Sequence, residues 1–359
     1  MRLRRNGRLT SPIRAVPVIA AVCAVGLLAA CSQAAVDPSS GKNGGGTELV
    51  TVGAECEDVT LRLAHALSPG SAVDLATERL AELAYEKSGG TLDVLVFPAS
   101  QLGNEQQFLE GLPSGSLDMA AIVGNAFGTV VPETNVLAMP YVFKGYEHMK
   151  TAMEGEPGQQ IAELVEERAG IRILDPTWYY GTRQLTANEP IRSAKDLKGV
   201  NLRITPVPVL NQAWERMGAT PSAVDFTELY TALQTGVVDA QENPLPTIAK
   251  SNFNEVQDYL MITDHTVANL MVAINPELHD SLCEDQRAAL DGATQEAGDF
   301  IDETVLLAEE ELVTQLTTEG GMELVEPDVD TFRSPLKGFA ETFQGGVMFD
   351  LYQIIQDAE

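Results

Sequence analysis

Between residues 58 and 275 the chain alternates strand-like with helix-like segments, and this alternation constrains the fold more than any other feature. The strand-like segments are short apolar runs, whereas the helix-like segments repeat apolar residues at helical spacing and often stop at glycine. The first of them are the strand-like 59–67, the helix-like 71–89 and the strand-like 91–98. Because strands separated by helices of this length pair in parallel through right-handed crossovers, the pattern predicts an α/β fold.

A second series of the same kind begins after Gly181. Once the first thirty residues are set aside, about 330 remain, which exceeds the usual size of one hydrophobic core and predicts two domains. Residues 284–318 then show one helical pattern, about 50 Å long at 1.5 Å per residue. A helix of that length can cross both domains, which suits two lobes that hinge around a cleft.

The first thirty residues have the pattern of a signal peptide. Residues 1–14 carry five arginines and no acid, and the apolar run that follows is too short to span a bilayer. The run ends in "LAAC", which resembles a bacterial lipobox, so we expect Cys31 to be acylated and to begin the mature chain. An ordinary secretion signal with an incidental cysteine is the alternative. Residues 31–57 are rich in Gly and Ser and are expected to form a flexible tether.

The chain is strongly acidic, with a formal net charge of −29. Such a chain is repelled by nucleic acid and by anionic lipid head groups, so neither is an expected partner. Membrane contact is expected through the lipid anchor only, which would place the protein on the outer face of the cytoplasmic membrane. An anionic ligand would need a local cluster of arginines to overcome this overall field.

Cysteine use leaves one pair to explain. Cys23 is lost with the signal peptide and Cys31 is assigned to lipid, so Cys56 and Cys283 remain. Outside the cytoplasm an even pair favours a disulfide, while two free buried thiols are the alternative.

Recognisable catalytic and metal-binding patterns are missing from the sequence. The four histidines (His65, His148, His265 and His279) do not stand at metal-ligand spacing on a helix, and there is no Gly-x-Ser-x-Gly elbow or dinucleotide fingerprint. We therefore expect no cofactor, no resident metal and no catalytic residue. An enzyme whose site is assembled from distant residues is the alternative.

Polar residues gather in one block, residues 179–244. Arg183 and Arg203 lie on strand-like segments, and Asn243 stands just ahead of Pro244, where a regular helix cannot continue. Ligands bind at strand ends in open α/β sheets, so this block is the candidate site. The structural alternatives are a solvated edge strand for Arg203, a turn-forming amide for Asn243 and a core position for Phe226.

Taken as a whole, the chain resembles the extracytoplasmic solute-binding proteins of TRAP (tripartite ATP-independent periplasmic) transporters, the DctP family. The phrases that carry the resemblance span about residues 58–345 and include "SQLGNEQQFLEGLPSGSLDM", "GTRQLT", "PIRSAKDLKGVNLRI" and "GATPSAVDFTELYTALQTGVVDAQENP". The family implies a two-lobed clam-shell with a mixed, mostly parallel sheet in each lobe and a long interdomain helix. Lobe I is then expected to be 58–180 plus 269–308, and lobe II 181–268 plus 309–359.

The resemblance also implies a site for a small organic acid. Arg203 occupies the position of the family's arginine, which grips the ligand carboxylate through a two-pronged salt bridge. The other expected ligand-binding residues are Arg183, Asn243, Phe226, Trp178, Tyr179 and Glu105. Ala240 stands where the family usually has glycine, which leaves the fine shape of the pocket open.

These expectations combine into one function. The chain is expected to be a lipid-anchored receptor that binds an organic acid and delivers it to integral-membrane TRAP permease subunits. A receptor of an ATP-driven importer and, less in keeping with the residues, an extracellular enzyme are the alternatives.

Overall fold

The computed structural model of the chain describes residues 56–358. The predicted signal peptide, Cys31 and nearly all of the predicted tether lie outside the described residues. Within the described part of the chain, no helix is both long enough and apolar enough to cross a membrane.

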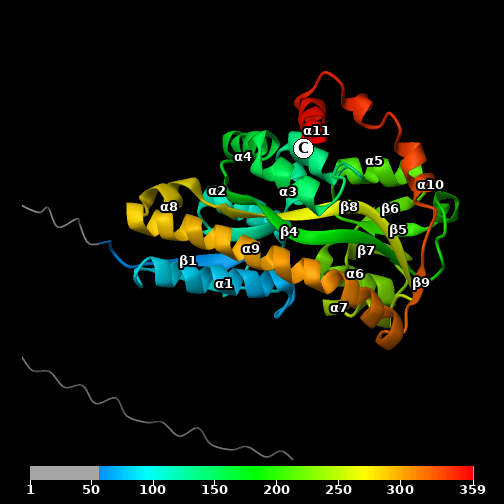
Figure 1. Cartoon of the computed structure of the whole chain (residues 1–359), viewed down its shortest axis with the longest axis horizontal. Coiled ribbons are helices and arrows are strands. Elements are labelled where there is room, and N and C mark those ends of the chain that lie inside the picture. The colour runs from blue at the N-terminus through cyan, green and yellow to red at the C-terminus, as the bar shows by residue number, and fades with distance from the viewer. Residues whose placement is uncertain (1–55, 359) are drawn as a thin grey trace, which may run out of the picture. The chain divides into compact units, whose positions relative to one another are not determined.

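The strands form one mixed sheet whose order is β2-β1-β3-β8-β4-β7-β5-β6, with β9 added beside β8 (Figure 1). The strands are β1 (Val59–Ala64), β2 (Leu92–Phe97), β3 (Met119–Val123), β4 (Arg172–Ala187), β5 (Asn201–Ile204), β6 (Thr220–Ala223), β7 (Ala240–Pro244), β8 (Tyr259–Ile274) and β9 (Glu323–Val325). The β1–β2, β1–β3, β5–β6, β5–β7 and β8–β9 pairs are parallel, while β4 runs antiparallel to β7 and β8, and β3 to β8.

The two long strands β4 and β8 join two halves of this sheet. β3 pairs with the last residues of β8, whereas β7 pairs with residues 183–187 at the other end of β4. Each of these two strands runs without interruption for 16 residues. The predicted fold class, a two-lobed α/β protein with mostly parallel strands, is therefore confirmed. The lobes share one hydrogen-bonded sheet rather than having one each.

The helices cover this sheet and begin where the sequence supplies caps. Asn104, for example, caps α2 by accepting a hydrogen bond from the backbone N–H of Gln107, and the Asn104 backbone N–H donates in turn to Gln107 Oε1. The helices are α1 (Ala72–Lys87), α2 (Glu105–Ser114), α3 (Tyr146–Glu154), α4 (Glu156–Ala169), α5 (Pro208–Met217), α6 (Phe226–Gln234), α7 (Leu245–Lys250), α8 (Pro276–Ser281), α9 (Glu284–Thr314), α10 (Val329–Arg333) and α11 (Val347–Asp357).

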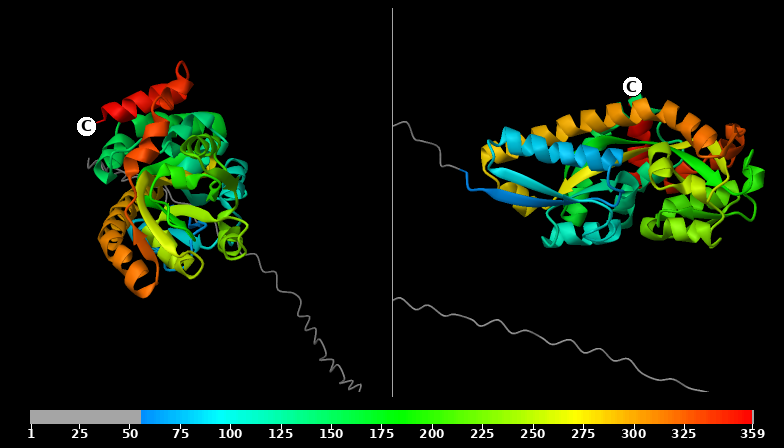
Figure 2. Two further views of the ribbon diagram at one scale, coloured as in Figure 1. Left: turned by 90° about the vertical axis from the view of Figure 1, so that its right-hand side faces the viewer. Right: turned by 90° about the horizontal axis from the view of Figure 1, so that it is seen from below.

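Helix α9 fulfils the prediction of a long helix that crosses both halves. Its 31 residues extend about 46 Å, and it packs along α1, β4 and α7 (Figures 1 and 2). At Gly298 the helix lies close to the sheet, and an added Cβ there would lie only 2.8 Å from the indole of Trp178. The end of the predicted helix lies in a π-helical segment, Gln315–Glu319.

Helix α11 corrects the expected division into lobes. It packs on α4 and on the 3₁₀ segment Pro132–Ala138, both of which belong to the predicted lobe I. The Gln356 side chain donates to Val142 O at 2.6 Å, and His148 Nε2 lies 2.9 Å from Ile355 O. The helix has an apolar face with a fully buried Leu351, and this face is covered by lobe I. Assigning all of 309–359 to lobe II was therefore wrong for this helix.

A disulfide joins Cys56, just before β1, to Cys283, just before α9, with Cα atoms 6.0 Å apart. The sequence left open whether Cys56 and Cys283 form a disulfide or remain free thiols, and the structure has the disulfide. The bond fastens the start of the folded part to the start of the long helix.

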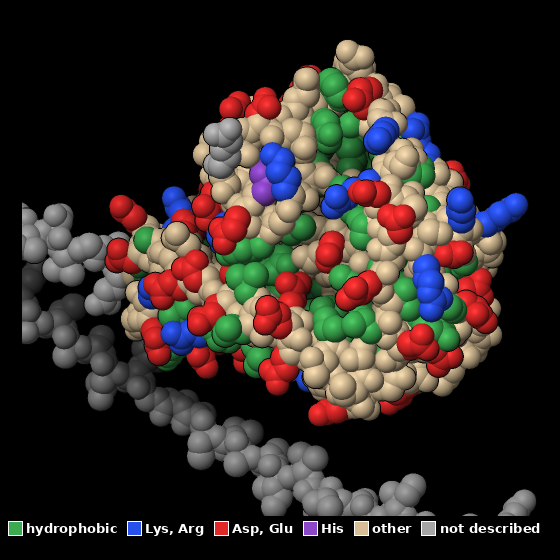
Figure 3. Space-filling model, turned by 45° about the vertical axis from the view of Figure 1, so that its right-hand side comes forward, with side chains coloured by type: hydrophobic (Ala, Val, Ile, Leu, Met, Phe, Trp, Pro, Cys, Tyr) green, Lys and Arg blue, Asp and Glu red, His purple; other side chains and the backbone are tan. Residues whose placement is uncertain are grey.

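The surface reflects the acidic composition. Asp and Glu side chains are scattered over the whole of the face in Figure 3. A binding site for an anion must therefore be shielded from this surface and must supply its own positive charge.

Candidate ligand-binding site

A chamber lies between the two halves of the sheet, where several strands end. Its walls come from the segments that follow β1, β3, β5 and β6, from the end of β7, and from the first turns of α2 and α6. This is the edge at which open α/β sheets bind ligands. An outer section with a cavity volume of about 40 Å³ and an inner section of about 30 Å³ meet at five shared residues, which are Ala66, Glu105, Arg203, Thr205 and Phe226.

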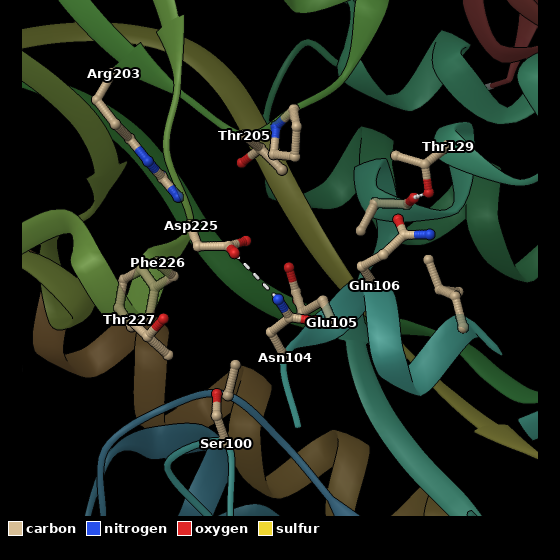
Figure 4. Close-up of a pocket in the computed structure, with 14 residues that line it drawn as sticks. Ser100, Asn104, Glu105, Gln106, Thr129, Arg203, Thr205, Asp225, Phe226 and Thr227 are labelled. Carbon is tan, nitrogen blue, oxygen red and sulfur yellow. Dashed lines mark hydrogen bonds between the residues drawn. The ribbon is translucent and has the colours of Figure 1, made fainter. Parts of the chain in front are cut away.

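Arg203 on β5 carries the positive charge of the shared wall. Its side chain is 3% exposed, and its Nε donates to Val224 O at 2.8 Å. Its two Nη atoms have no hydrogen-bond partner, and the residue makes no ion pair, among residues 56–358. Figure 4 shows the guanidinium pointing into the chamber. Burial lowers the pKa of Arg203 to about 10, against the opposing effect of Glu242, so the group remains a cation at neutral pH.

Arg183 on β4 is equally buried but is already paired. Its Nη2 donates to Glu242 Oε1 at 2.9 Å and to Glu242 O at 2.6 Å, and its Nε donates to Glu242 Oε2. His265 Nε2 lies 3.0 Å from the same carboxylate. Burial alone would raise the pKa of Glu242, but the charge of Arg183 and the hydrogen bonds from His265 and Arg183 lower it to about 2. The predicted second cation is thus in the inner wall, with most of its donors used by an acid that the sequence analysis did not select.

Glu105, the first residue of α2, faces both sections of the chamber. Its Oε1 accepts a hydrogen bond from Val123 N at 3.1 Å. Burial raises the pKa of Glu105, although this hydrogen bond and the charges of Arg203 and Arg183 counteract the rise. Glu105 is therefore part of the chamber wall, and its contact with a ligand remains a prediction.

The rim of the chamber is closed by a contact between two helix starts. Asn104, the cap of α2, donates from Nδ2 to Asp225 Oδ2 at 3.1 Å, and Asp225 immediately precedes α6 (Figure 4). These two residues come from opposite halves of the sheet. The hydrogen bond therefore holds the halves together across the mouth of the chamber.

Asn243 lines the inner section of the chamber, and Phe226 lines both sections. Asn243 Oδ1 accepts from Arg183 Nη2 at 3.1 Å, and its amide nitrogen donates to Gln241 Oε1. Phe226 opens α6 and forms an apolar part of both sections, with its ring edge-on to Phe253.

Trp178 and Tyr179 do not reach the chamber, which corrects the prediction for both. Trp178 Nε1 donates to Thr294 O at 3.1 Å, and Tyr179 Oη donates to the Glu309 carboxylate at 3.0 Å, so both side chains face α9. Tyr180 lines the inner section instead. Strand β4 shifts register between Tyr179 and Gly181, and the pairing irregularity changes which side chain faces the ligand side.

Sequence reasoning also missed Ser100, which lines the outer section. Its Oγ is buried without a hydrogen-bond partner in the described part of the chain. Ser100 and the preceding Ala99 both have left-handed backbone, with φ of 57° and 52°. Two successive non-glycine residues in this region are strained, and such strain is concentrated at functional sites. The local sequence "PASQ" carries no chemical signal that would have identified this position.

Taken together, the chamber offers one buried cation, Arg203, that has no ion-pair partner among the described residues, together with two acids, Glu105 and Asp225, and several neutral polar groups. Among residues 56–358 no group of three or more His, Cys, Asp or Glu side chains is arranged to hold a metal ion. A chamber of this kind, between two α/β halves that share crossing strands and a long helix, defines a two-lobed solute-binding protein.

Comparison with known proteins gives the family. Residues 63–341 match the bacterial extracellular solute-binding protein family 7, DctP. The chain therefore belongs to the DctP family of TRAP-transporter solute-binding proteins. This family consists of substrate receptors of transporters and not of enzymes, which decides against the enzyme alternative and favours a TRAP transporter over an ATP-driven importer.

Relatives with assigned ligands extend over most of the chain. The sialic acid-binding periplasmic protein SiaP of Vibrio cholerae is 34% identical over 289 residues, which cover 80% of this chain and 89% of SiaP. A TRAP solute-binding protein of Polaromonas sp. JS666, solved with D-erythronate, has a TM-score of 0.80 and 27% identity, covering 84% of this chain and 99% of that one. Another from Roseobacter denitrificans OCh 114, solved with L-galactonate, has a TM-score of 0.77 and 31% identity, with the same coverage of the two chains.

Proposed function

We propose that this protein binds a small organic acid in the chamber through a salt bridge between Arg203 and the ligand carboxylate. It would then deliver the acid to the membrane permease subunits of a TRAP transporter. The observation that carries this proposal is that Arg203 is 3% exposed and has two Nη atoms without a partner in the described residues.

The energetics of burial support this role. A buried charge is costly unless it is paired, and its usual partner inside a protein is an opposite charge. The planar guanidinium presents two parallel donors that match a carboxylate, and the exclusion of water strengthens such charge-assisted bonds. Since Nε is already fixed by Val224 O, the two Nη atoms are the donors left for a ligand.

The relatives support the ligand class. The three that are described above bind sialic acid, D-erythronate and L-galactonate, each of which is a carboxylic acid. Their chains are covered nearly completely by this one, so the whole binding domain is shared and not only a fragment.

The test of this proposal is a thermal-shift screen of the chain from residue 32 onward, called here the anchor-free chain. The screen compares small organic acids with their neutral amides. We expect at least one acid to raise the melting temperature while its amide does not. A flat response to every acid, together with a shift for a neutral sugar or an amine, would overturn carboxylate capture.

We further propose that Cys31 is lipidated and tethers the receptor to the outer face of the cytoplasmic membrane. The support is the "LAAC" pattern after an arginine-rich start and an apolar run. Cells that express the full chain should place it in the membrane fraction, and mass spectrometry should find an acylated Cys31 as the first residue. As the control, the Cys31→Ser variant should carry no acyl group and should be released from the membrane fraction. Release of the unchanged chain from the membrane fraction would contradict the lipid anchor.

A further inference from the structure

Across the chamber from Arg203 the wall is acidic. Glu105 uses Oε1 to accept from Val123 N, and its Oε2 has no partner among residues 56–358. At the exposed rim, Asp225 uses Oδ2 to accept from Asn104, and its Oδ1 is likewise unpartnered in that range. Figure 4 shows Arg203, Glu105 and Asp225 all directed toward the middle of the chamber. Free carboxylate oxygens accept hydrogen bonds and donate none, so they match hydroxyl groups of a ligand.

Some charged side chains of the chamber pair with each other, and others have no ion-pair partner among the described residues. Arg183 and Glu242 neutralise each other in the inner wall. Arg203 is then the one cation left for a ligand, since the residues that line both sections include no other Lys or Arg. One ligand carboxylate at Arg203 balances that charge. A second carboxylate would meet the acidic wall without a second free cation.

A hydroxyl of the protein completes the polar wall. Ser100 Oγ lies buried at the outer section without a partner in the described residues, although a buried hydroxyl is normally hydrogen-bonded. Its left-handed backbone, with φ of 57°, holds it at that place. A hydroxyl can both donate and accept a hydrogen bond. Ser100 can therefore hydrogen-bond to a hydroxyl group of a ligand but not to an alkyl chain.

From this geometry we infer that the ligand is a hydroxylated monocarboxylate of the aldonate type and that Glu105 discriminates against dicarboxylates. The inference rests on the proposed function, because it presumes that one carboxylate occupies Arg203. Asp225 has a smaller part, since it lies at the exposed rim where water screens its charge.

The test uses pairs of acids that differ only in the group at the far end. Galactonate and galactarate share one carbon skeleton, as do erythronate and meso-tartrate, and in each pair a CH₂OH group is replaced by a second carboxylate. The calorimetric titrations use the anchor-free chain at pH 8. We expect one of the two aldonates to bind on the order of a hundredfold more tightly than its dicarboxylate. Butyrate, which lacks the hydroxyls of erythronate, should bind more weakly than the preferred aldonate by about tenfold or more.

Substitutions of the acidic wall residues test whether they cause the preference for an aldonate over a dicarboxylate. Glu105→Gln keeps the shape and removes the charge, so the aldonate-to-dicarboxylate ratio should fall by about tenfold or more, and Asp225→Asn should lower it less. Glu110→Gln is the matched control, because Glu110 lies on the exposed face of the same helix, and the ratio should not change. The melting temperature of each variant shows that it is folded.

The outcomes separate this inference from the proposed function. If a dicarboxylate binds as tightly as its aldonate, or if Glu105→Gln leaves the ratio unchanged, the inference fails while carboxylate capture stands. The inference also fails if butyrate binds as well as the aldonate. If no acid binds and a neutral sugar does, the proposed function fails and the inference fails with it.

Discussion

The two buried arginines of the chamber lie on strands of the same sheet and are equally hidden from solvent, yet they are used in opposite ways. Arg183 and Arg203 are each 3% exposed. Arg183 is neutralised by Glu242, which His265 also contacts, whereas the hydrogen bond of Arg203 goes only to the backbone at Val224. A buried arginine with an internal partner belongs to the fold. One without a partner in the described chain is left for a ligand.

The difference has an energetic meaning. A pair of buried charges recovers part of its desolvation cost within the folded chain, so removing one partner destabilises the protein. An unpaired cation leaves that cost in the free receptor, and a ligand carboxylate can offset it on binding. Disrupting the Arg183 pair should therefore lower the stability of the folded chain, whereas removing Arg203 should lower the affinity for the ligand. The predictions below test this contrast, from the largest expected effect to the smallest.

Glu242→Ala should produce the largest loss of stability. It leaves Arg183 buried without its partner, and we expect the free energy of unfolding to fall by about 3–5 kcal/mol in denaturant titrations. Arg203→Ala, in contrast, should change the unfolding free energy of the ligand-free chain by less than about 1 kcal/mol. Equal losses in the two variants would mean that the two arginines are not used differently.

Arg203→Lys should weaken binding of the acid by about 2–4 kcal/mol, although the charge is retained. The ammonium group is a point charge and loses the second prong of the guanidinium fork. Isothermal titration measures the loss. Arg192→Lys serves as the control because Arg192 is exposed. A lysine variant that binds as tightly as the parent would show that two-pronged geometry is not needed.

Acid should destabilise the fold through Glu242. Its pKa is lowered to about 2 in the folded chain from an ordinary value of 4.5, so the unfolded chain takes up the proton first. The stabilising contribution is complete above pH 4.5 and is lost as the pH falls toward 2. In Glu242→Gln this part of the pH dependence should be missing from unfolding curves measured between pH 5 and 2.5. Parallel curves for parent and variant would contradict the assignment.

Asn104→Ala should have the smallest effect. It removes the hydrogen bond to Asp225 at the partly exposed rim, and we expect a loss of affinity of about 0.5–1.5 kcal/mol, mostly as faster ligand release. Stopped-flow dissociation measurements would detect it. A loss as large as that of Arg203→Lys would mean that the rim, and not the arginine, dominates binding.

The sequence was a good guide where local patterns decide the structure. The alternating segments predicted the α/β fold, and the apolar spacing of residues 284–318 predicted the long helix α9. The strand pattern around Arg203 and the family resemblance placed that residue in the site. These features are determined by residues close together in the sequence, so the sequence alone could predict them.

The sequence failed where distant segments or irregular backbone decide the structure. The partner of Arg183 lies 59 residues away on β7, and no periodicity predicts that contact. The register shift in β4 brings Tyr180 to the chamber in place of Trp178 and Tyr179, and a regular alternation cannot anticipate such a shift. Ser100 depends on a left-handed turn that its own sequence does not favour.

The most direct test of the central claim is a thermodynamic cycle of four titrations. The acid found in the screen and its neutral amide are each titrated into the anchor-free chain and into Arg203→Ala. The account predicts that the parent chain prefers the acid by about a hundredfold and that Arg203→Ala loses most of this preference. If Arg203→Ala keeps the full preference for the acid, another group binds the carboxylate and the account is wrong.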